Sequence, residues 1–403
     1  MKDRMNIPMT IRANLRTNLR TSLRVKHLIP VAVLALLLSL PYSTLRIPGV
    51  LDGAVNTPGS LQLLALCLLF AGLAVGYDLL FGRLGLMSFG HALYVALGAY
   101  GAELAMKNLH LPLAAAALLA IVIGAAVAAV LGVISLKGVG KLGTVGFAMV
   151  TLAFAQAGSI LVGRDPRTTG GEEGLPLSTE KVPAAFVGVV NTVNLYWLAL
   201  AYLVLVCAVV WALVAGPVGR SWQAVRDNER RAEVLGLNPF RYQLGAFVLA
   251  GTLGAAGGVV HLLVTAGATP ETTTSDFTLA LLVMVVLGGS GTRWGPVLGG
   301  VLYTLLDHRL GALATSDSVA GLPTALRVPL SQPLVLLGAL FVIVVHAVPG
   351  GLAALPRRLG ALRSGLRRGR RTGPGGERGE QHGLGVVEGE PHRSHADRVP
   401  SEL

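Results

Sequence analysis

Long apolar runs, separated by short polar or glycine-rich stretches, dominate the chain from residue 28 to residue 350. A helix needs about 20 predominantly apolar residues to cross a membrane. Ten runs approach or reach this length, and they predict membrane-spanning helices. The runs lie at 28–44, 60–80, 84–105, 112–136, 143–162, 192–214, 243–266, 277–290, 294–310 and 331–348. The expected fold is therefore all-α, a polytopic transmembrane helical bundle of about ten spans.

Two of these runs are weaker than the others. The run 277–290 is short and ends in the sequence GGSG, and the run 294–310 begins with WGP. Such interrupted segments are typical of broken helices that line a transporter's cavity, because irregular backbone at membrane depth must face protein or water. The glycine-rich segment 82–100 lies in a comparable place in the first half, which leaves open either an internal repeat or ordinary tight helix packing. Eight spans plus re-entrant segments would also satisfy the pattern.

Basic residues gather immediately outside the first and last runs. The segment 1–27 holds seven Lys or Arg residues against one acid, and the segment 357–371 holds seven arginines and no acid. Basic flanks are retained in the cytoplasm, and an even number of spans places both termini there. We therefore expect a basic cytoplasmic N-terminal tail at 1–27, a transmembrane domain at 28–350, and a cytoplasmic C-terminal tail at 351–403 that is basic and then disordered.

Composition agrees with lipid as the surrounding solvent. Only 13% of the residues are charged, 53% are hydrophobic, and the mean hydropathy is +0.64, whereas a soluble protein carries roughly a quarter charged residues. The net charge of +12 does not predict nucleic-acid binding, because the flanking arginines have no aromatic stacking residues among them. Cys67 and Cys207 both lie inside apolar runs, so no disulfide framework, metal site or cofactor is predicted.

The polar segment 216–242 separates two of the strongest runs and carries most of the candidate chemistry. Its charged residues accompany an apolar stripe, and Gly236 followed by Asn238 and Pro239 provides a stop signal. This pattern predicts a short amphipathic cytoplasmic helix. Such a helix can be a solvated connector, or it can dock its apolar face into a groove on a partner protein. Charge alone does not decide between the two.

Four stretches, in order along residues 60–350, resemble the permease subunits of branched-chain amino-acid ABC transporters of the LivM subtype. The stretches are 76–100 with its Ser-Phe-Gly-His run, 147–156 with Thr-Leu-Ala-Phe followed by Thr-Gly-Gly at 169–171, 220–263, and 284–302 with Leu-Gly-Gly-x-Gly-Thr-x-x-Gly-Pro. In that family the cytoplasmic loop is a variant of the Glu-Ala-Ala loop, which sits in a cleft of the ATPase. Glu233 and Gly236 match its glutamate and glycine, although the Glu-Ala-Ala triplet itself is degenerate here.

The resemblance implies the membrane-spanning permease subunit of an importer in the inner membrane, with 28–350 as the permease domain and 216–242 as the coupling loop. It also implies a second homologous permease subunit, two ATP-binding subunits, an extracytoplasmic substrate-binding protein and a small amino-acid substrate. Transport would proceed by alternating access. The chain is not expected to be an enzyme: it lacks the sequence G-x-x-x-x-G-K followed by Ser or Thr, so ATP hydrolysis is expected in separate subunits.

The interpretation as an importer permease assigns roles to individual residues. Those expected to couple the chain to the ATPase are Arg226, Glu229, Glu233 and Gly236. Those expected along the substrate path are Ser88, Phe89, His91, Thr151 and Gln156. The structural glycines expected are Gly85, Gly90, Gly288, Gly289 and Gly291. For His91 two roles stay open, since a histidine at membrane depth either faces a cavity or bonds a neighbouring carbonyl.

Alternatives remain for function as well. A stand-alone secondary transporter would need a buried ion-coupling acid. Asp78, Glu103 and Asp307 are the acids within the apolar runs, but all three lie near predicted span ends, which favours solvation at the interface. Among ABC importers, urea and short amides use similar permeases and sugars use more distant ones, so the cargo stays open.

Overall fold

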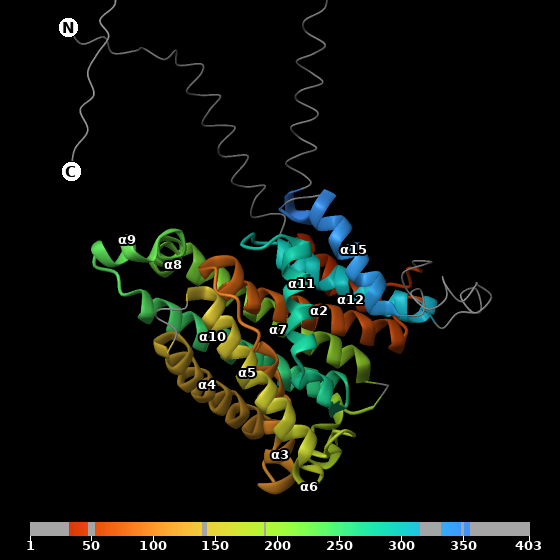
Figure 1. Ribbon diagram of the computed structural model, residues 1–403. Coiled ribbons are helices and arrows are strands. Elements are labelled where there is room, and N and C mark those ends of the chain that lie inside the picture. Colours follow the sequence, from red (N-terminus) through yellow and green to blue (C-terminus); the bar gives the residue numbers. More distant parts are fainter. Residues whose placement is uncertain are drawn as a thin grey trace, which may run out of the picture. The chain divides into compact units, whose positions relative to one another are not determined.

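The computed structural model describes residues 32–46, 53–138, 143–188, 191–314, 332–347 and 350–354. The tails predicted at 1–27 and beyond 354 lie outside the described residues. The described chain is almost entirely helical (Figure 1). After a short apolar helix, Ala32–Tyr42, its helices are α2 (Pro58–Asp78) with the π-helical turn η2 (Leu79–Leu84), α3 (His91–Asn108), α4 (Leu113–Gly138), α5 (Gly143–Arg164), α6 (Pro166–Thr169), α7 (Thr192–Ala215), α8 (Pro217–Asp227), α9 (Glu229–Val234), α10 (Pro239–Val264), α11 (Ser275–Gly288), α12 (Gly295–Ala314) and α15 (Pro333–Ala347).

The expected all-α polytopic fold is confirmed, with a helix at each predicted apolar run. Five helices have the length and hydropathy to cross a membrane, namely α2 with η2, α4, α5, α7 and α10. The helix at 32–42 and α11 are apolar but shorter. The run 84–105 was predicted as one span, and this is wrong at its start: residues 85–90 are not helical and α3 begins only at His91. The interruption follows Gly85, whose φ of +71° ends the π-helical turn.

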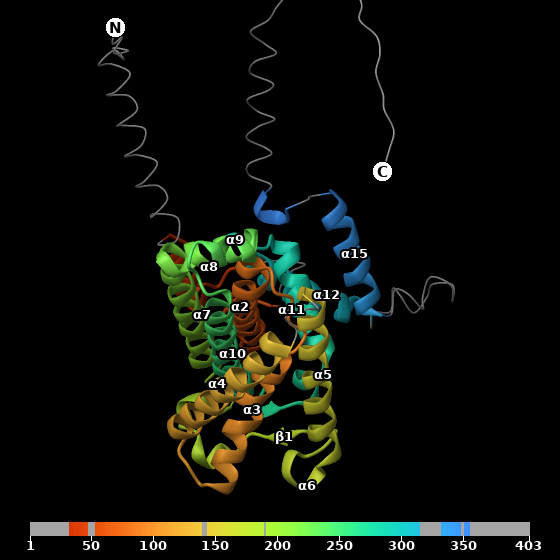
Figure 2. The same cartoon turned by 60° about the vertical axis from the view of Figure 1, so that its left-hand side comes forward.

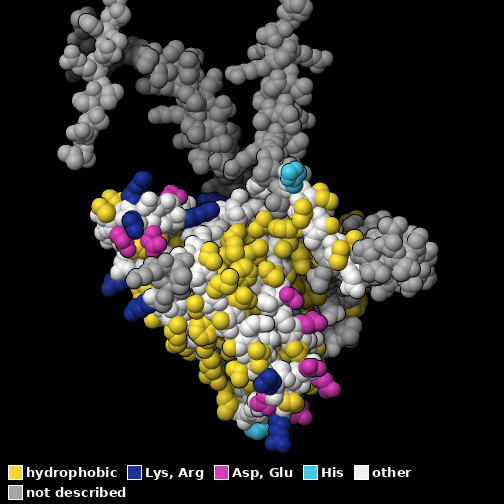
Figure 3. Space-filling view, in the orientation of Figure 1, with side chains coloured by type: hydrophobic (Ala, Val, Ile, Leu, Met, Phe, Trp, Pro, Cys, Tyr) yellow, Lys and Arg dark blue, Asp and Glu magenta, His cyan; other side chains and the backbone are white. Residues whose placement is uncertain are grey.

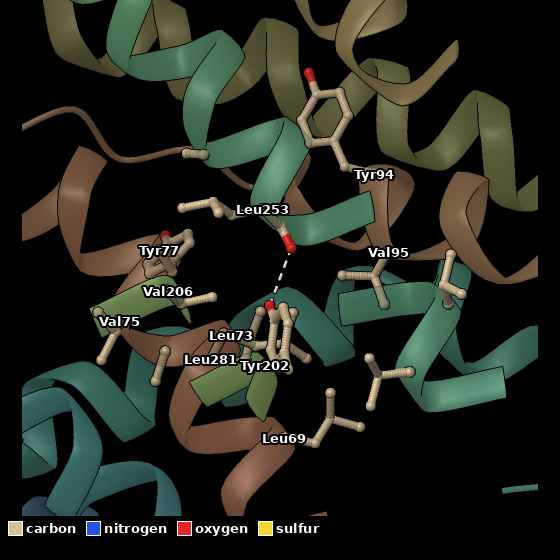
Figure 4. Close-up of a cluster of buried hydrophobic side chains, with 14 of the residues drawn as sticks. Leu69, Leu73, Val75, Tyr77, Tyr94, Val95, Tyr202, Val206, Leu253 and Leu281 are labelled. Atoms are coloured by element: carbon tan, nitrogen blue, oxygen red, sulfur yellow. Dashed lines mark hydrogen bonds between the residues drawn. The ribbon is translucent and has the colours of Figure 1, made fainter. Parts of the chain in front are cut away.

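Two central helices organise the packing. Helices α2 and α10 are mostly buried inside the bundle, whereas α4 and α5 are mostly exposed. Helix α10 packs against α2, α3, α4 and α7. Its contact with α3 is so close that a Cβ on Gly258 would lie 1.9 Å from the carbonyl oxygen of Val95. The Tyr202 hydroxyl of α7 donates to the Leu253 carbonyl of α10 at 2.9 Å (Figure 4). Small residues and such polar contacts are how helices associate in lipid.

The two ends of the bundle differ from its sides. Figure 2 places α8 and α9 at one end, here named the α8 end, and α6 with strand β1 (Leu175–Pro176) at the other, here named the α6 end. Strand β1 pairs with β2 (Gly267–Ala268) in an antiparallel register, Leu175 opposite Ala268. In Figure 3 apolar side chains cover the face between these ends, and charged side chains gather at both of them. This is the surface distribution of a protein that spans a membrane.

Two shorter helices begin next to each other in the interior and run in opposite directions. The backbone N–H of Ala92 at the start of α3 donates to the Thr278 hydroxyl near the start of α11 at 2.9 Å. Helix α3 then leads to the α6 end, and α11 leads to the α8 end (Figures 1 and 2). Helix α3 follows α2–η2 after the non-helical segment 85–90, and α11 follows α10 after strand β2 and the 3-10 helix Pro270–Thr273. An internal repeat of the two halves stays a prediction beside ordinary tight helix packing.

Candidate coupling surface and transport path

The polar segment 216–242 forms two helices at the α8 end, not the single helix predicted. Asn228 separates α8 from α9 because its backbone is extended, with φ −163° and ψ 107°, and its side chain accepts from the N–H of Arg231 at 2.9 Å. This is an N-cap that begins a new helix. The continuous apolar stripe concealed the break, although an asparagine one position before Glu229 is a recognisable start signal.

Helix α9 ends in a rigid turn. The N–H of Gly236 donates to the Glu233 carbonyl at 2.9 Å and the N–H of Leu237 to the Ala232 carbonyl at 3.0 Å. This pair of hydrogen bonds is a Schellman motif, which requires a left-handed residue, and Gly236 has φ +84°. Gly236 therefore shapes the turn, and a Cβ there would meet no atom within 4 Å.

The apolar stripe of the segment divides between the bundle and the exterior. Trp222 and Val225 of α8 are 3% and 4% exposed, and the Trp222 indole N–H donates to the Tyr242 carbonyl at 3.2 Å. In contrast, Val234 and Leu235 at the tip of α9 are 88% and 73% exposed. The stripe of α8 is therefore used inside the chain, and only the α9 tip offers apolar surface to a partner.

The charged residues predicted for coupling take different positions. Arg226 is an exposed residue of α8, and its guanidinium donates through Nη1 to the Gly82 carbonyl at the end of α2–η2. Glu229 accepts from the Gln243 amide at 3.3 Å. Glu233 is exposed and lines a cavity of about 730 Å³ together with Arg226 and Glu229. The segment 84–86 and the facing ends of α4 and α5 contribute its other walls.

A buried polar cluster lies beneath α8, and the sequence analysis did not predict it. Asp78 is 3% exposed, which contradicts its expected solvation at the interface. One of its oxygens accepts from the backbone N–H of Gly291 at 2.8 Å, and the other lies 3.9 Å from Arg83 Nε. The partner glycine is 213 residues away in the sequence, so no local signal could reveal the contact.

Three of the predicted path residues meet where α3 begins. The N–H of Phe89 donates to the Thr151 hydroxyl of α5 at 3.1 Å, and that hydroxyl donates to the Ala148 carbonyl at 2.9 Å. Ser88 is buried, and its carbonyl accepts from the Tyr77 hydroxyl at 3.0 Å. These contacts hold the non-helical segment 85–90 at its depth in the bundle, as backbone groups in a low-dielectric interior require partners.

The other two predicted path residues, His91 and Gln156, do not take part in these contacts. His91 is fully buried at the first position of α3, with its ring against the edges of Tyr77 and Tyr94 at centroid distances of 5.4 and 6.1 Å. Neither ring nitrogen has a hydrogen-bond partner within the part of the chain that is described, so the bond to a neighbouring carbonyl, one of the two roles left open for His91, is not formed there. Gln156 lies on the exposed side of α5, away from the Ser88–Thr151 contacts.

The α6 end has a buried carboxylate of its own. Glu103 of α3 is 1% exposed and accepts from both the backbone N–H, at 3.1 Å, and the hydroxyl of Ser178. This residue too was expected at a solvated interface, and the structure places it inside. Asp307 is exposed on α12, in agreement with that expectation. Also at the α6 end, hydrogen bonds from the side chain and backbone of Thr168 lower the pKa of Asp165, which is the N-cap residue of α6.

The predicted structural glycines all lie at close approaches or left-handed positions. A Cβ on Gly90 would lie 2.9 Å from the Thr151 carbonyl oxygen, and one on Gly288 would lie 1.8 Å from that of Gly295. Gly289 has φ +110° and Gly291 has φ +71°. These two residues begin the turn from α11 to α12, which the sequence GGSG had indicated.

Comparison with known proteins agrees with this architecture. LivM, a high-affinity branched-chain amino acid transport system permease protein of Salmonella typhimurium, is 26% identical over 337 residues, covering 77% of this chain and 74% of the relative. LivM of Escherichia coli K12 is 28% identical over 269 residues, covering 61% of this chain and 62% of the relative. The autoinducer 2 import system permease protein LsrC of Klebsiella pneumoniae is 35% identical over 167 residues, 38% of this chain and 46% of the relative.

No solved structure is significantly similar to the chain. The family model for the branched-chain amino acid transport system / permease component matches residues 59–345, which include every interrupted helix, the α8–α9 segment and the buried carboxylates described above. The match covers well over half of the sequence and agrees with the multi-pass helical fold. The chain therefore belongs to the branched-chain amino acid transport system permease family.

Proposed function

We propose that this chain translocates branched-chain amino acids across the inner membrane as one permease subunit of an ABC importer, by alternating access. The observation that carries the proposal is the two-sided construction of α8–α9. Its inner side is fixed to the bundle through Trp222 and Arg226, and its tip exposes Val234 and Leu235 beside Glu233. A segment that is attached to the bundle on one side and exposes an apolar surface on the other can receive force from a partner protein.

The partners follow from what the chain lacks and from its relatives. It has no phosphate-binding loop motif, so two ATP-binding subunits bound at the α8 end supply the energy. A second homologous permease subunit completes the path, and an extracytoplasmic substrate-binding protein delivers cargo at the α6 end. Both termini are then cytoplasmic. Nucleotide binding drives transport only by favouring one conformation of the permease over the other.

The substrate path in this proposal runs beside α5 and the start of α3. Ser88, Phe89 and Thr151 shape the path wall through the contacts described above, and His91 and Gln156 belong to it by position on α3 and α5. In this proposal the path residues are permissive, and the binding protein sets most of the selectivity.

Two competing functions make different predictions. LsrC relatives match a shorter part of the chain at higher identity, which supports the same subunit role with another cargo, as would a urea or short-amide importer. A stand-alone secondary transporter would instead move its solute without ATPases. Uptake of labelled L-leucine, urea and autoinducer 2 by cells that express the whole transporter distinguishes the cargoes. Vesicles that contain this chain alone should transport none of them.

The decisive test of coupling is Glu233→Lys. Reversing this exposed charge at the α9 tip should separate the chain from its ATPases and reduce L-leucine uptake by more than about tenfold, which corresponds to about 1.4 kcal/mol of lost interaction. Co-purification of the ATPases with a tagged chain measures docking directly. Glu180→Lys, the same reversal at an exposed position of the α6 end, should leave co-purification unchanged. Undiminished uptake in the Glu233→Lys variant contradicts the proposal.

A further inference from the structure

The Asp78 cluster, defined as Asp78, Gly82, Arg83, Arg226 and Gly291, joins three parts of the chain that are remote in sequence. Asp78 and Arg83 lie on α2–η2, Gly291 lies in the turn between α11 and α12, and Arg226 lies on α8. The Asp78 carboxylate fastens the first part to the second through the Gly291 N–H at 2.8 Å. Arg226 fastens the third part to the first through the Gly82 carbonyl.

The cluster is closely fitted and leaves no space for a side chain at its centre. A Cβ on Gly82 would lie 1.9 Å from an Asp78 carboxylate oxygen and 2.4 Å from the Gly291 nitrogen. A Cβ on Gly291 would lie 2.8 Å from the Gly82 carbonyl oxygen and 3.6 Å from Arg226 Nη1. Close contact between the two glycines therefore allows the carboxylate and the guanidinium to reach the same pair of turns from opposite sides.

Arg226 contacts the end of α2–η2 at two points and lies near the turn at Gly291. Its aliphatic stem lies against Gly85, with Cγ 3.5 Å from where a Cβ would be, and its Nη1 atom bonds Gly82. The turn after Gly291 has a further contact through Trp294, whose ring packs against Trp211 of α7 with centroids 4.8 Å apart. A π-helical turn such as η2 is a frequent site of functional distortion in helices.

Stability alone is a weak reason for this arrangement. A buried ion pair generally contributes little net stability, because removing the charges from water costs about as much as the pair regains. The Asp78–Arg83 distance of 3.9 Å is at the long end for such a pair. A buried carboxylate that accepts from the backbone of a remote turn does, however, fix the position of that turn.

We propose that Asp78 is a positioning residue for coupling: it fastens the α2–η2 end to the 289–294 turn, so that a displacement of α8 through Arg226 reaches η2 and the turn between α11 and α12 at once. This proposal rests on the coupling role proposed for α8–α9. It adds Asp78, Arg83 and Gly82 to the residues that carry the motion inward. Helix α12 also packs against α2 along its length, and the Asp78 link adds a polar connection at the α8 end, where α8 is attached.

The test uses the complete transporter, reconstituted in vesicles with its ATPases, second permease and binding protein, and measures L-leucine uptake per ATP hydrolysed. Asp78→Ala removes the acceptor of the Gly291 N–H, and it should lower this ratio by about fivefold or more while the tagged chain still co-purifies with the ATPases. Gly82→Ala, which leaves every charge in place and pushes the carboxylate away, should have the same effect. Loss of assembly in both variants would show a purely structural role and overturn the proposal.

A double-mutant cycle with Arg226→Gln gives the sharper result. Because Asp78 and Arg226 act through one link, the double variant Asp78→Ala with Arg226→Gln should have a ratio within about twofold of the single variant that has the lower ratio. Glu103→Ala, which removes the other buried carboxylate, serves as the matched control, and its effect should multiply with that of Arg226→Gln. Multiplying losses in the Asp78 cycle, or a normal ratio for Asp78→Ala, would overturn the proposal. A normal Glu233→Lys variant would instead remove the proposed function itself.

Discussion

The two buried carboxylates, Asp78 at the α8 end and Glu103 at the α6 end, show how differently the ends of this bundle are built. Each accepts a hydrogen bond from the backbone N–H of a remote loop, Gly291 for one and Ser178 for the other. The difference lies in what surrounds them. Asp78 lies beside Arg83 and beneath Arg226, whereas the partners that the described residues give Glu103 are the neutral N–H and hydroxyl of Ser178.

This contrast separates two tasks. At the α6 end the carboxylate fixes one loop near the β1–β2 pair, which stabilises a surface. At the α8 end the Asp78 carboxylate joins the end of α2–η2 to the turn between α11 and α12. Helix α8 is attached to the same place through Arg226. Charged partners at the α8 end make the cluster sensitive to substitution, because removing one partner of a buried charge leaves the other uncompensated.

The largest effect that would test this comparison is expected from Arg226→Glu. The new carboxylate would face the carbonyl of Gly82 next to Asp78, and like charges placed together cost several kcal/mol. We expect L-leucine uptake by the complete transporter to fall by more than about tenfold. Arg220→Glu, the same change at another exposed position of α8 that lies outside the Asp78 cluster, is the matched control and should keep most of the uptake. Equal losses in both variants would mean that total charge, not the Asp78 cluster, matters at this end.

A smaller and different effect is expected from Glu103→Leu. The variant leaves the Ser178 N–H and hydroxyl without their buried acceptor, and an unpaired buried polar group costs about 1–3 kcal/mol. The purified chain should therefore unfold at a lower temperature. Uptake per ATP hydrolysed should stay near that of the parent protein at temperatures where the variant is folded. A fall in this ratio comparable to that of Asp78→Ala would erase the distinction between the two ends.

The positions of the helices and of one turn could be predicted from the sequence, whereas the burial of the two carboxylates could not, and the reasons are physical. Apolar runs located the helices because lipid requires long apolar segments, and the sequence GGSG located the turn after α11 because left-handed backbone favours glycine. Asp78 was misjudged because proximity to a span end says nothing about a partner 213 residues away. The same holds for Glu103, whose partner is 75 residues away.

The candidate site shows the same division. Gly236 was predicted correctly as a helix stop, since its role depends on neighbouring residues alone. The break at Asn228 was missed because the apolar stripe continues across it. The hydrogen bond from Arg226 to the Gly82 carbonyl depends on where Gly82 lies, and that is a property of the folded bundle. The assignments for coupling and for the path stay predictions until variants are measured.

The smallest effect is expected from removal of residues 373–403, which are predicted to share the cytoplasmic side with α8. The segment is rich in Gly, Pro, Glu and Arg and has no apolar period, so it lacks the means to bury a surface against the bundle. Uptake of L-leucine by cells that express the truncated chain should equal that of the parent within about twofold, because a change below roughly 0.4 kcal/mol is within ordinary surface effects. Immunoblots of membrane fractions verify equal amounts of the two chains. A large loss at equal amounts would mean that the α8 end contains a regulatory or assembly element besides the Asp78 cluster, and the contrast between the two ends would then depend on more than their buried carboxylates.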